Sequence, residues 1–472
     1  MRADGDLTIE AKPVPTVSQP RQGRESPKPH AADAAADEAV VRKIYRRLIG
    51  FLFVLFVFSF LDRINIGFAG LTMGRDLGLT ATAFGLASTV FYGAYILFGI
   101  PSNIMLGKLG ARRWIAIIMV AWGLTSTATM FAWDANSLYI LRILVGITEA
   151  GFLPGVLLYM TFWFPSAHRA RANAFFMIAM PVTSALGAIV SGYLLKLDGL
   201  HGLHGWQWLF MLEGLPSALL GIVVWMYLDD TPEKAKWLTP AERARLAAMM
   251  ARDAASSPVR KAGGKEVSLA KALFSLPVMQ LAVAYFLLVN TLGMISTWVP
   301  QIVKSFNQSS SDLAIGMLTA VPHVCTIVAM VVWGRRSDKH QERRLHVALP
   351  MLFAAAGWGL TSFAADPLVK LAGLCAASAG AYAAMTIFWT LPDLVMSANH
   401  RAIGIAFINA AGIVGAALNA VIIGYLRDVT SSFTSGLLYA AAVLVVGALV
   451  VVTFARSGAS GKRATPKHAL EA

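Results

Sequence analysis

Cysteine and charge are both scarce in this chain of 472 residues: there are two cysteines, and charged residues make up 14% of the sequence. Cys325 and Cys375 lie in apolar runs, where a thiol packs as a small hydrophobic group, so we expect no disulfide framework. A soluble domain carries about 25% charged residues, whereas 57% of this chain is hydrophobic and its mean hydropathy is +0.61. This composition indicates a protein that crosses a membrane many times.

Sequence motifs for catalysis are also missing. The chain contains neither an HExxH zinc pattern nor a GxxxxGK[ST] phosphate loop. Most of its nine histidines fall in expected loops or tails, and only His323 is expected well inside a helix. We therefore expect no enzyme activity, no catalytic residues, no metal site, no cofactor and no ATP drive.

Long apolar segments fill most of the sequence. A helix needs about 20 apolar residues to cross the hydrocarbon core of a bilayer. Reading the chain with that window predicts an all-α membrane protein of twelve helices, at 48–71, 84–106, 114–132, 137–161, 172–195, 207–228, 274–300, 313–334, 345–365, 371–396, 402–426 and 433–455.

The basic residues are strongly biased to one side of these helices. If both termini lie on the same side, that side holds 33 of the 40 lysines and arginines. Short loops with this bias are cytoplasmic, so both termini are predicted to be cytoplasmic. The formal charge of +14 is thereby explained as an orientation signal, and no nucleic-acid partner is needed. The opposite side holds five basic residues, namely Arg75, Lys196, Lys304, Lys370 and Arg427.

Polar segments divide the chain into two halves. Residues 1–44 lack apolar periodicity and are predicted to be a disordered cytoplasmic tail without a secretory signal. Six helices are expected in 45–229 and six in 273–457. The linker 230–272 contains TPAERARLAAMMARD, which predicts a short surface helix, and 458–472 is a second tail.

Two cytoplasmic loops repeat at an offset of 231 residues. NIMLGKLGARR follows the second expected helix, and GRRSDKHQERR follows the eighth. Equivalent basic loops in two six-helix halves are typical of a duplicated transporter, although a chance match of two Arg-Arg pairs is the alternative. The matched positions are Lys108, Arg112 and Arg113 with Lys339, Arg343 and Arg344.

The spacing of these loops resembles the signature of the major facilitator superfamily. The second copy has Gly334, Asp338 and Lys339 followed by the paired arginines, whereas the first has Asn103 and Gly107 where Gly and Asp are usual. The resemblance implies that these loops close a cytoplasmic gate. Because Gly107 stands where that Asp is usual, the sequence does not show which carboxylate completes the charge network of the first loop.

Four ionisable residues fall within expected helices 1 and 4: Asp62, Arg63, Arg142 and Glu149. A charge near the bilayer centre costs about 2.5–3.5 kcal/mol on insertion scales, so it persists where it is paired or faces an aqueous cavity. Arg142 and Glu149 are seven residues apart and share a helix face. Asp62 and Glu149 are both expected near mid-depth, about 21 Å and 18 Å into their helices. These residues form either a closed structural pair or a site that binds protons and an anion.

Several stretches resemble the anion:cation symporter branch, which includes tartrate, phthalate and hexonate permeases, D-galactonate transporters and sialin-type carriers. They include LDRINIGFA, FYGAYILFGIPSN, RILVGITEAGFLPGVLLYMTFWFP and GIAFINAAG. The resemblance implies proton-coupling roles for Asp62 and Glu149. It implies that Arg63 contacts the substrate carboxylate and that Arg142 poises the carboxylate of helix 4.

The same resemblance implies substrate contacts by Tyr95, Trp389 and Asn409. Tyr95 could instead be a packing residue and Trp389 an interfacial aromatic, although Trp389 is expected mid-helix. Asn409 needs a hydrogen-bond partner in lipid, which a neighbouring helix or a ligand could supply. Gly151 and Gly155 form a small-xxx-small pair, which favours sliding contact within a monomer over dimerisation.

Together these features predict a bacterial inner-membrane transporter that takes up a small organic acid anion with protons by alternating access. The alternative is a proton-coupled drug or metabolite exporter of the same fold. Exporters of that kind carry a GPxxGG-type run in helix 5, whereas this chain has FFMIAMPVTSALGAIVSGYLL there. Two arginines within the membrane also favour an anion over a lipophilic cation.

Overall fold

The computed structural model describes residues 31–256, 273–340, 342–396 and 401–458. This part of the chain is helical, and twelve helical segments are long and apolar enough to cross a membrane, which confirms the predicted number of spans. The first half contains α1 (Ala31–Ala69), α2 (Met73–Asp76), α3 (Ala81–Leu109), α4 (Ala111–Ala128), α5 (Ala135–Glu149), α6 (Phe152–Trp163), α7 (Ser166–Leu194) and α8 (Gly205–Tyr227).

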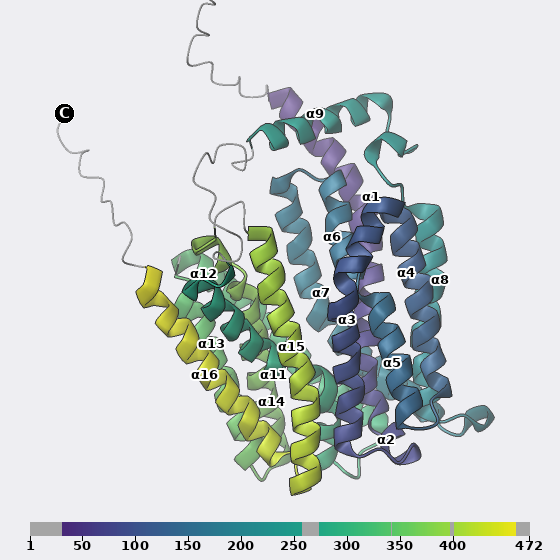
Figure 1. Ribbon diagram of the computed structural model, residues 1–472, viewed down its shortest axis with the longest axis vertical. Coiled ribbons are helices and arrows are strands. Elements are labelled where there is room, and N and C mark those ends of the chain that lie inside the picture. Colours follow the sequence, from purple (N-terminus) through teal and green to yellow (C-terminus); the bar gives the residue numbers. More distant parts are fainter. Residues whose placement is uncertain (1–30, 257–272, 341, 397–400, 459–472) are drawn as a thin grey trace, which may run out of the picture.

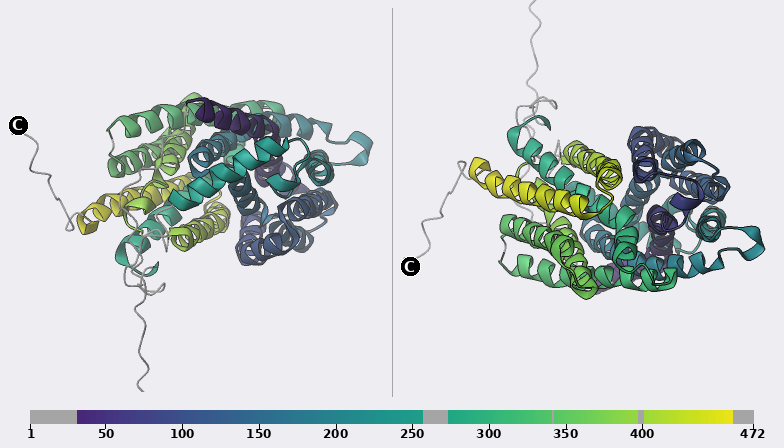
Figure 2. Two further views of the ribbon diagram at one scale, coloured as in Figure 1. Left: turned by 90° about the horizontal axis from the view of Figure 1, so that it is seen from above. Right: turned by 90° about the horizontal axis from the view of Figure 1, so that it is seen from below.

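The second half follows the linker helix α9 (Pro240–Ser256). Its helices are α11 (Leu276–Phe306), α12 (Asp312–His340), α13 (Arg344–Phe363), α14 (Pro367–Phe388), α15 (Arg401–Thr430) and α16 (Thr434–Gly458). The two halves lie side by side in all three views (Figures 1 and 2). The start of α1, helix α9 and the end of α16 lie towards one end of the bundle (Figure 1), which the basic loops assign to the cytoplasm.

The halves approach closely at the opposite, outer end. A Cβ atom added to Gly85 on α3 would lie 2.2 Å from the carbonyl oxygen of Ala420 on α15. A Cβ atom on Gly316 of α12 would lie 2.4 Å from the carbonyl oxygen of Ala188 on α7. Small residues permit such contacts between helix backbones. These contacts close the outer side in this conformation, whereas the ribbons of the two halves diverge towards the cytoplasmic end (Figure 1).

Helix α1 begins earlier than the sequence predicted. Residues 31–44, assigned above to a disordered tail, are the first turns of α1, while 1–30 lie outside the described residues. The segment AADAAADEAVVRK is rich in alanine, which favours a helix. Val40, Val41 and Ile44 are buried there. Tertiary packing therefore stabilises this extension of α1 in addition to its local helix propensity.

Helix α9 covers this extension of α1 at the cytoplasmic end (Figure 1), and it is the surface helix predicted in the linker. Lys43 on α1 donates to Glu242 at 2.8 Å. Asp37 on α1 accepts from Arg245 at 3.1 Å and from Arg252 at 2.7 Å. The linker is therefore fastened to the first half of the protein.

Two spans are less regular than predicted. The fourth is broken, because α5 ends at Glu149 and α6 begins at Phe152. Pro154 has no N–H to donate to the carbonyl of Ala150, so a continuous helix is disfavoured. In the tenth span α14 ends at Phe388, so Trp389 caps a helix end rather than lying mid-helix.

Candidate functional site

A buried ion pair joins α1 to α5. The Arg63 guanidinium donates two hydrogen bonds to Oε1 of Glu149, through Nε at 3.1 Å and through a terminal nitrogen at closer range. Ser59, one turn earlier on α1, lies 3.4 Å from the same oxygen. The Glu149 side chain is 1% exposed, whereas that of Arg63 is 23% exposed. The arginine therefore reaches an accessible surface while its carboxylate partner does not.

The second oxygen of Glu149 is free. Its Oε2 atom is buried and has no hydrogen-bond partner among the described residues. Uncompensated buried carboxylate oxygens are energetically costly. Glu149 thus has one oxygen held by a cation and one oxygen available to accept a proton.

Arg142 lies two turns before Glu149 on α5 and is buried, with 2% exposure. Its guanidinium carbon lies 5.1 Å from the centre of the Phe91 ring on α3, and its charge interacts with that of Glu149. Its Nε has no partner within the described part of the chain. Arg142 is therefore a second positive charge beside Glu149, held by an aromatic face rather than by a carboxylate.

Asp62 makes its hydrogen bonds to a different set of side chains. It accepts hydrogen bonds from Trp122 Nε1 at 2.7 Å and from the hydroxyls of Ser126 and Ser217, each at 2.8 Å. The amide nitrogen of Asn65 lies 3.3 Å from Oδ1, the oxygen that also accepts from Ser126. Trp122 and Ser126 are on α4 and Ser217 is on α8, so Asp62 lies inside the first half. Asp62 and its neighbour Arg63 therefore have different hydrogen-bond partners.

Tyr95 joins the site on α3. The Arg63 guanidinium carbon lies 4.9 Å from the centre of the Tyr95 ring, a cation–π contact. Tyr92 lies on the same helix, near Ser296 of α11, and was not among the predicted site residues. Tyr92 also lies near Arg63 and Arg142, so it links the arginines to the second half. The three-residue spacing in FYGAY places both tyrosines on one helix face and is the signal that could have identified Tyr92.

Trp389 and Asn409 belong to the second half. The Trp389 ring packs 4.7 Å from the Tyr285 ring on α11, and it is partly exposed. Trp389 follows 22 residues of α14, which places it towards the cytoplasmic end. The Asn409 side chain is exposed on α15. These two residues lie in different surroundings from the Arg63–Glu149 pair.

The first basic loop (103–113) lies beside a carboxylate from elsewhere in the chain. Its usual Asp is replaced by Gly107, yet Oδ1 of Asp230, which follows α8, accepts the backbone N–H of Arg112 at 3.1 Å. The Arg112 guanidinium carbon lies 5.7 Å from the Trp225 ring. A negative charge therefore does lie at the start of α4, supplied by the linker rather than by the loop.

The second basic loop (334–344) contains its own ion pair. Arg343 donates to Asp338 at 2.8 Å and to the Ser337 hydroxyl at 2.9 Å. Next to it, Glu342 accepts the backbone N–H groups of Leu345 and His346. Burial raises the pKa of Glu342, but these hydrogen bonds outweigh it and hold the pKa below its ordinary value.

A twelve-span protein made of two six-helix halves, closed on one side and with paired ions between its helices, is a membrane transporter. The chain belongs to the Major Facilitator Superfamily, whose sequence profile matches residues 51–418 and 281–471. It is accordingly not an enzyme.

Individual relatives agree with this assignment. The chain is 41% identical to a protein of Agrobacterium vitis named "Putative tartrate transporter", over 89% of this chain and 92% of that one. It is 32% identical to a quinolone resistance transporter of Acinetobacter baumannii, over 88% and 94%. A bacterial homologue of the human lysosomal transporter Spinster, solved in an inward-facing conformation, matches with a TM-score of 0.74 at 15% identity, over 90% and 99% of the two chains. This last likeness concerns the fold alone.

Proposed function

We propose that the protein takes up a small organic acid anion together with protons across the bacterial inner membrane, acting as a monomer. The observation that carries the proposal is the asymmetric Glu149 carboxylate, with one oxygen held by Arg63 and the other buried and unpartnered. The name of the Agrobacterium relative supports a hydroxy-dicarboxylate such as tartrate as the first substrate to test.

Coupling follows from competition for Arg63. A planar guanidinium binds one carboxylate through two parallel hydrogen bonds. When a substrate carboxylate takes this position, Glu149 loses its partner in a low-dielectric environment and is stabilised by accepting a proton on Oε2. When substrate leaves towards the cytoplasm, Arg63 returns to Glu149 and the proton is released. Arg142 supports release, because a second nearby cation favours the ionised carboxylate.

The other predicted residues have supporting roles in this scheme. Tyr95 holds the Arg63 guanidinium against its ring. The paired N–H donors of the guanidinium are thereby oriented before the substrate carboxylate arrives. Asp62 is the second proton-binding carboxylate, acting through the packing of α1 against α4 and α8. Trp389 and Asn409 contact substrate from the second half on its way towards the cytoplasm.

The test is Glu149→Gln in proteoliposomes, with tartrate as the probe. Uptake driven by an inward proton gradient should be lost, while exchange of labelled for unlabelled tartrate at equal pH should continue. Glu213→Gln is the matched control, because Glu213 is equally buried in the first half and bonds to Ser191 at 2.8 Å. Undiminished gradient-driven uptake by Glu149→Gln would remove Glu149 from the coupling role.

Export of a drug or metabolite is the second candidate. The quinolone resistance transporter among the relatives favours it. Expression in a drug-sensitive host distinguishes the two: raised quinolone tolerance without carboxylate uptake would support export and contradict the proposal above.

A further inference from the structure

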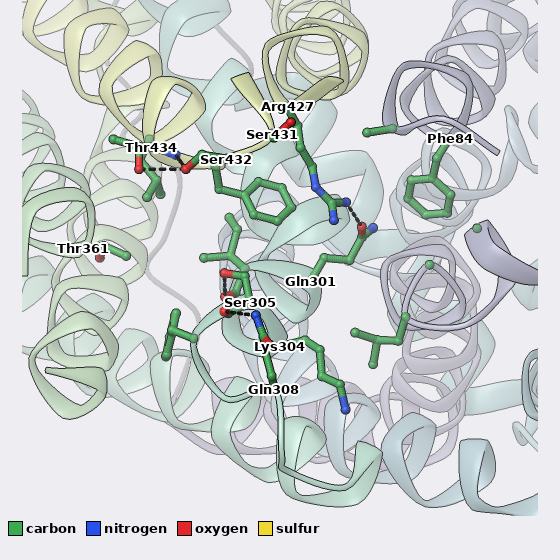
Figure 3. A pocket seen from close by; sticks show the side chains of 18 of the residues that line it. Phe84, Gln301, Lys304, Ser305, Gln308, Thr361, Arg427, Ser431, Ser432 and Thr434 are labelled. Atoms are coloured by element: carbon green, nitrogen blue, oxygen red, sulfur yellow. Dashed lines mark hydrogen bonds between the residues drawn. The ribbon is translucent and has the colours of Figure 1, made fainter. Parts of the chain in front are cut away.

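The outer end of the bundle contains a cup of about 640 Å³ (Figure 3). Its wall on one side comes from the residues just after α1, from α2 and from the start of α3. The other side comes from α11, α13, α14, α15 and α16. Gly70 lies at its edge, seven residues beyond Arg63 on the chain, or about 10 Å at 1.5 Å per residue. The cup therefore lies over the closed outer end and spans both halves.

The lining of the cup is strongly basic. Of the five lysines and arginines assigned to the outer side, four line it: Arg75, Lys304, Lys370 and Arg427. Cations are disfavoured on this side of a membrane protein, yet these four come from separate helices and loops and meet at one cavity. Among the described residues that line the cup there is no Asp or Glu.

Nearby acids compensate these cations unevenly. Lys304 lies 3.5 Å from Asp312, and Arg75 lies 3.4 Å from Asp76. Arg427 instead donates to the neutral amide oxygen of Gln301 at 3.1 Å (Figure 3), and its guanidinium carbon lies 4.5 Å from the Phe433 ring.

Lys370 is held in a similar way, with its ammonium 5.5 Å from the Phe306 ring. The next residue after Arg427, Asp428, forms no ion pair with it but accepts hydrogen bonds from the start of α3, although its charge also acts on Arg427. The charges of Arg427 and Lys370 are thus positioned by aromatic and neutral groups, which leaves them available to an anion.

We propose that this cup is a collecting site for small carboxylate anions on the outer face, with Arg427 and Lys370 as its principal binding groups. A cavity lined by one sign of charge raises the local concentration of the opposite ion. Hydroxyl groups around the rim, including those of Ser431 and Thr434, supply further donors. That the collected anion is also the transported one rests on the proposed function; that the cup binds anions does not.

The test measures the charge selectivity of the cup without using transport. A reporter thiol is introduced as Ser305→Cys, at an exposed lining position, after Cys325→Ala and Cys375→Ala remove the native thiols. Full-length protein in nanodiscs is then labelled with an anionic sulfonatoethyl or a cationic trimethylammonioethyl methanethiosulfonate. The matched control is Asn136→Cys, an exposed position at the outer end of α5 away from the cup.

The anionic reagent should react with the Ser305→Cys thiol faster than the cationic one by about tenfold relative to the control. This preference should shrink with added salt, with sodium tartrate, and in Arg427→Gln/Lys370→Gln. A rate ratio equal to that of the control, or one unchanged by the double substitution, would overturn the proposal. If charge selectivity holds but no carboxylate is transported, the collecting site stands and the proposed substrate class falls.

Discussion

The Asp428 carboxylate, near the end of α15, accepts the backbone N–H of Thr82 at 2.8 Å and that of Ala81 at 2.9 Å. It also accepts the Thr82 hydroxyl at 2.5 Å. Ala81 and Thr82 are the first two residues of α3, whose N–H groups have no partner within the helix. One half of the protein therefore caps a helix of the other half on the outer side, where a negative charge also complements the helix dipole.

Asp428→Ala should weaken this outer contact. Loss of a cap costs about 1 kcal/mol, equivalent to roughly a fivefold shift towards outer-open conformations. Spin labels at Asn136→Cys and Ser309→Cys, one in each half, would report the opening as a longer distance. Asp312→Ala is the control, because Asp312 pairs with Lys304 inside one half. An unchanged distance distribution in Asp428→Ala would show that this cap does not keep the outer side closed.

Arg63→Lys should raise the KM for the transported carboxylate at least tenfold, or about 1.4 kcal/mol. Lysine keeps the charge but loses the fork that binds a carboxylate through two bonds. Initial uptake rates over a range of tartrate concentrations provide the measurement, with the exposed cytoplasmic Arg46→Lys as the control. If both variants keep the wild-type KM, Arg63 does not contact substrate.

Trp122→Phe should destabilise the first half by about 1–3 kcal/mol, because the buried Asp62 carboxylate loses its closest donor. Thermal unfolding of the purified protein measures the change. Trp133→Phe, at a side chain that is 76% exposed, should leave the melting temperature near that of the wild type. Equal melting temperatures for the two variants would mean that the Trp122 bond contributes nothing to stability.

Asp37→Asn should loosen α9, because Asp37 bonds to both Arg245 and Arg252. Surface ion pairs are each worth about 0.2–1 kcal/mol, so the loss of two should quicken amide exchange in α9 about two- to thirtyfold by mass spectrometry. The exposed neighbour Glu38→Gln is the control. If the two variants exchange at the same rate, apolar packing rather than the Asp37 ion pairs keeps α9 attached to α1.

Acid should loosen the same helix. Hydrogen bonds from Lys43 and from the backbone N–H of Thr239 lower the pKa of Glu242. A lowered pKa in the folded state means that the ionised form stabilises the docked helix at neutral pH. This contribution is lost as pH falls below the ordinary glutamate value of about 4.3. Glu242→Gln should reduce this pH dependence of α9 exchange after correction for intrinsic rates, leaving the part due to Asp253, whose pKa is also lowered.

The number of spans, the division into two halves and the α9 helix followed from sequence, because apolar length and charge bias act locally along the chain. The ionisable residues within the membrane were equally visible, since each is costly in lipid whatever its partner. The sequence did not show which groups each of these ionisable residues would contact. Asp62 and Arg63 are consecutive, yet a helix turns about 100° per residue, so one faces Trp122 and the other faces Glu149.

Tertiary structure decided the remaining features. Asp230 replaces the acid missing at Gly107, and Asp428 caps α3, because packing brings together residues 118 and 346 positions apart. Four outer cations converge on one cup for the same reason. Sequence determines which residues must cross the lipid, since that depends on each segment's own transfer energy. Which charges meet depends on how the helices pack, because their separation along the chain says nothing of their distance in space.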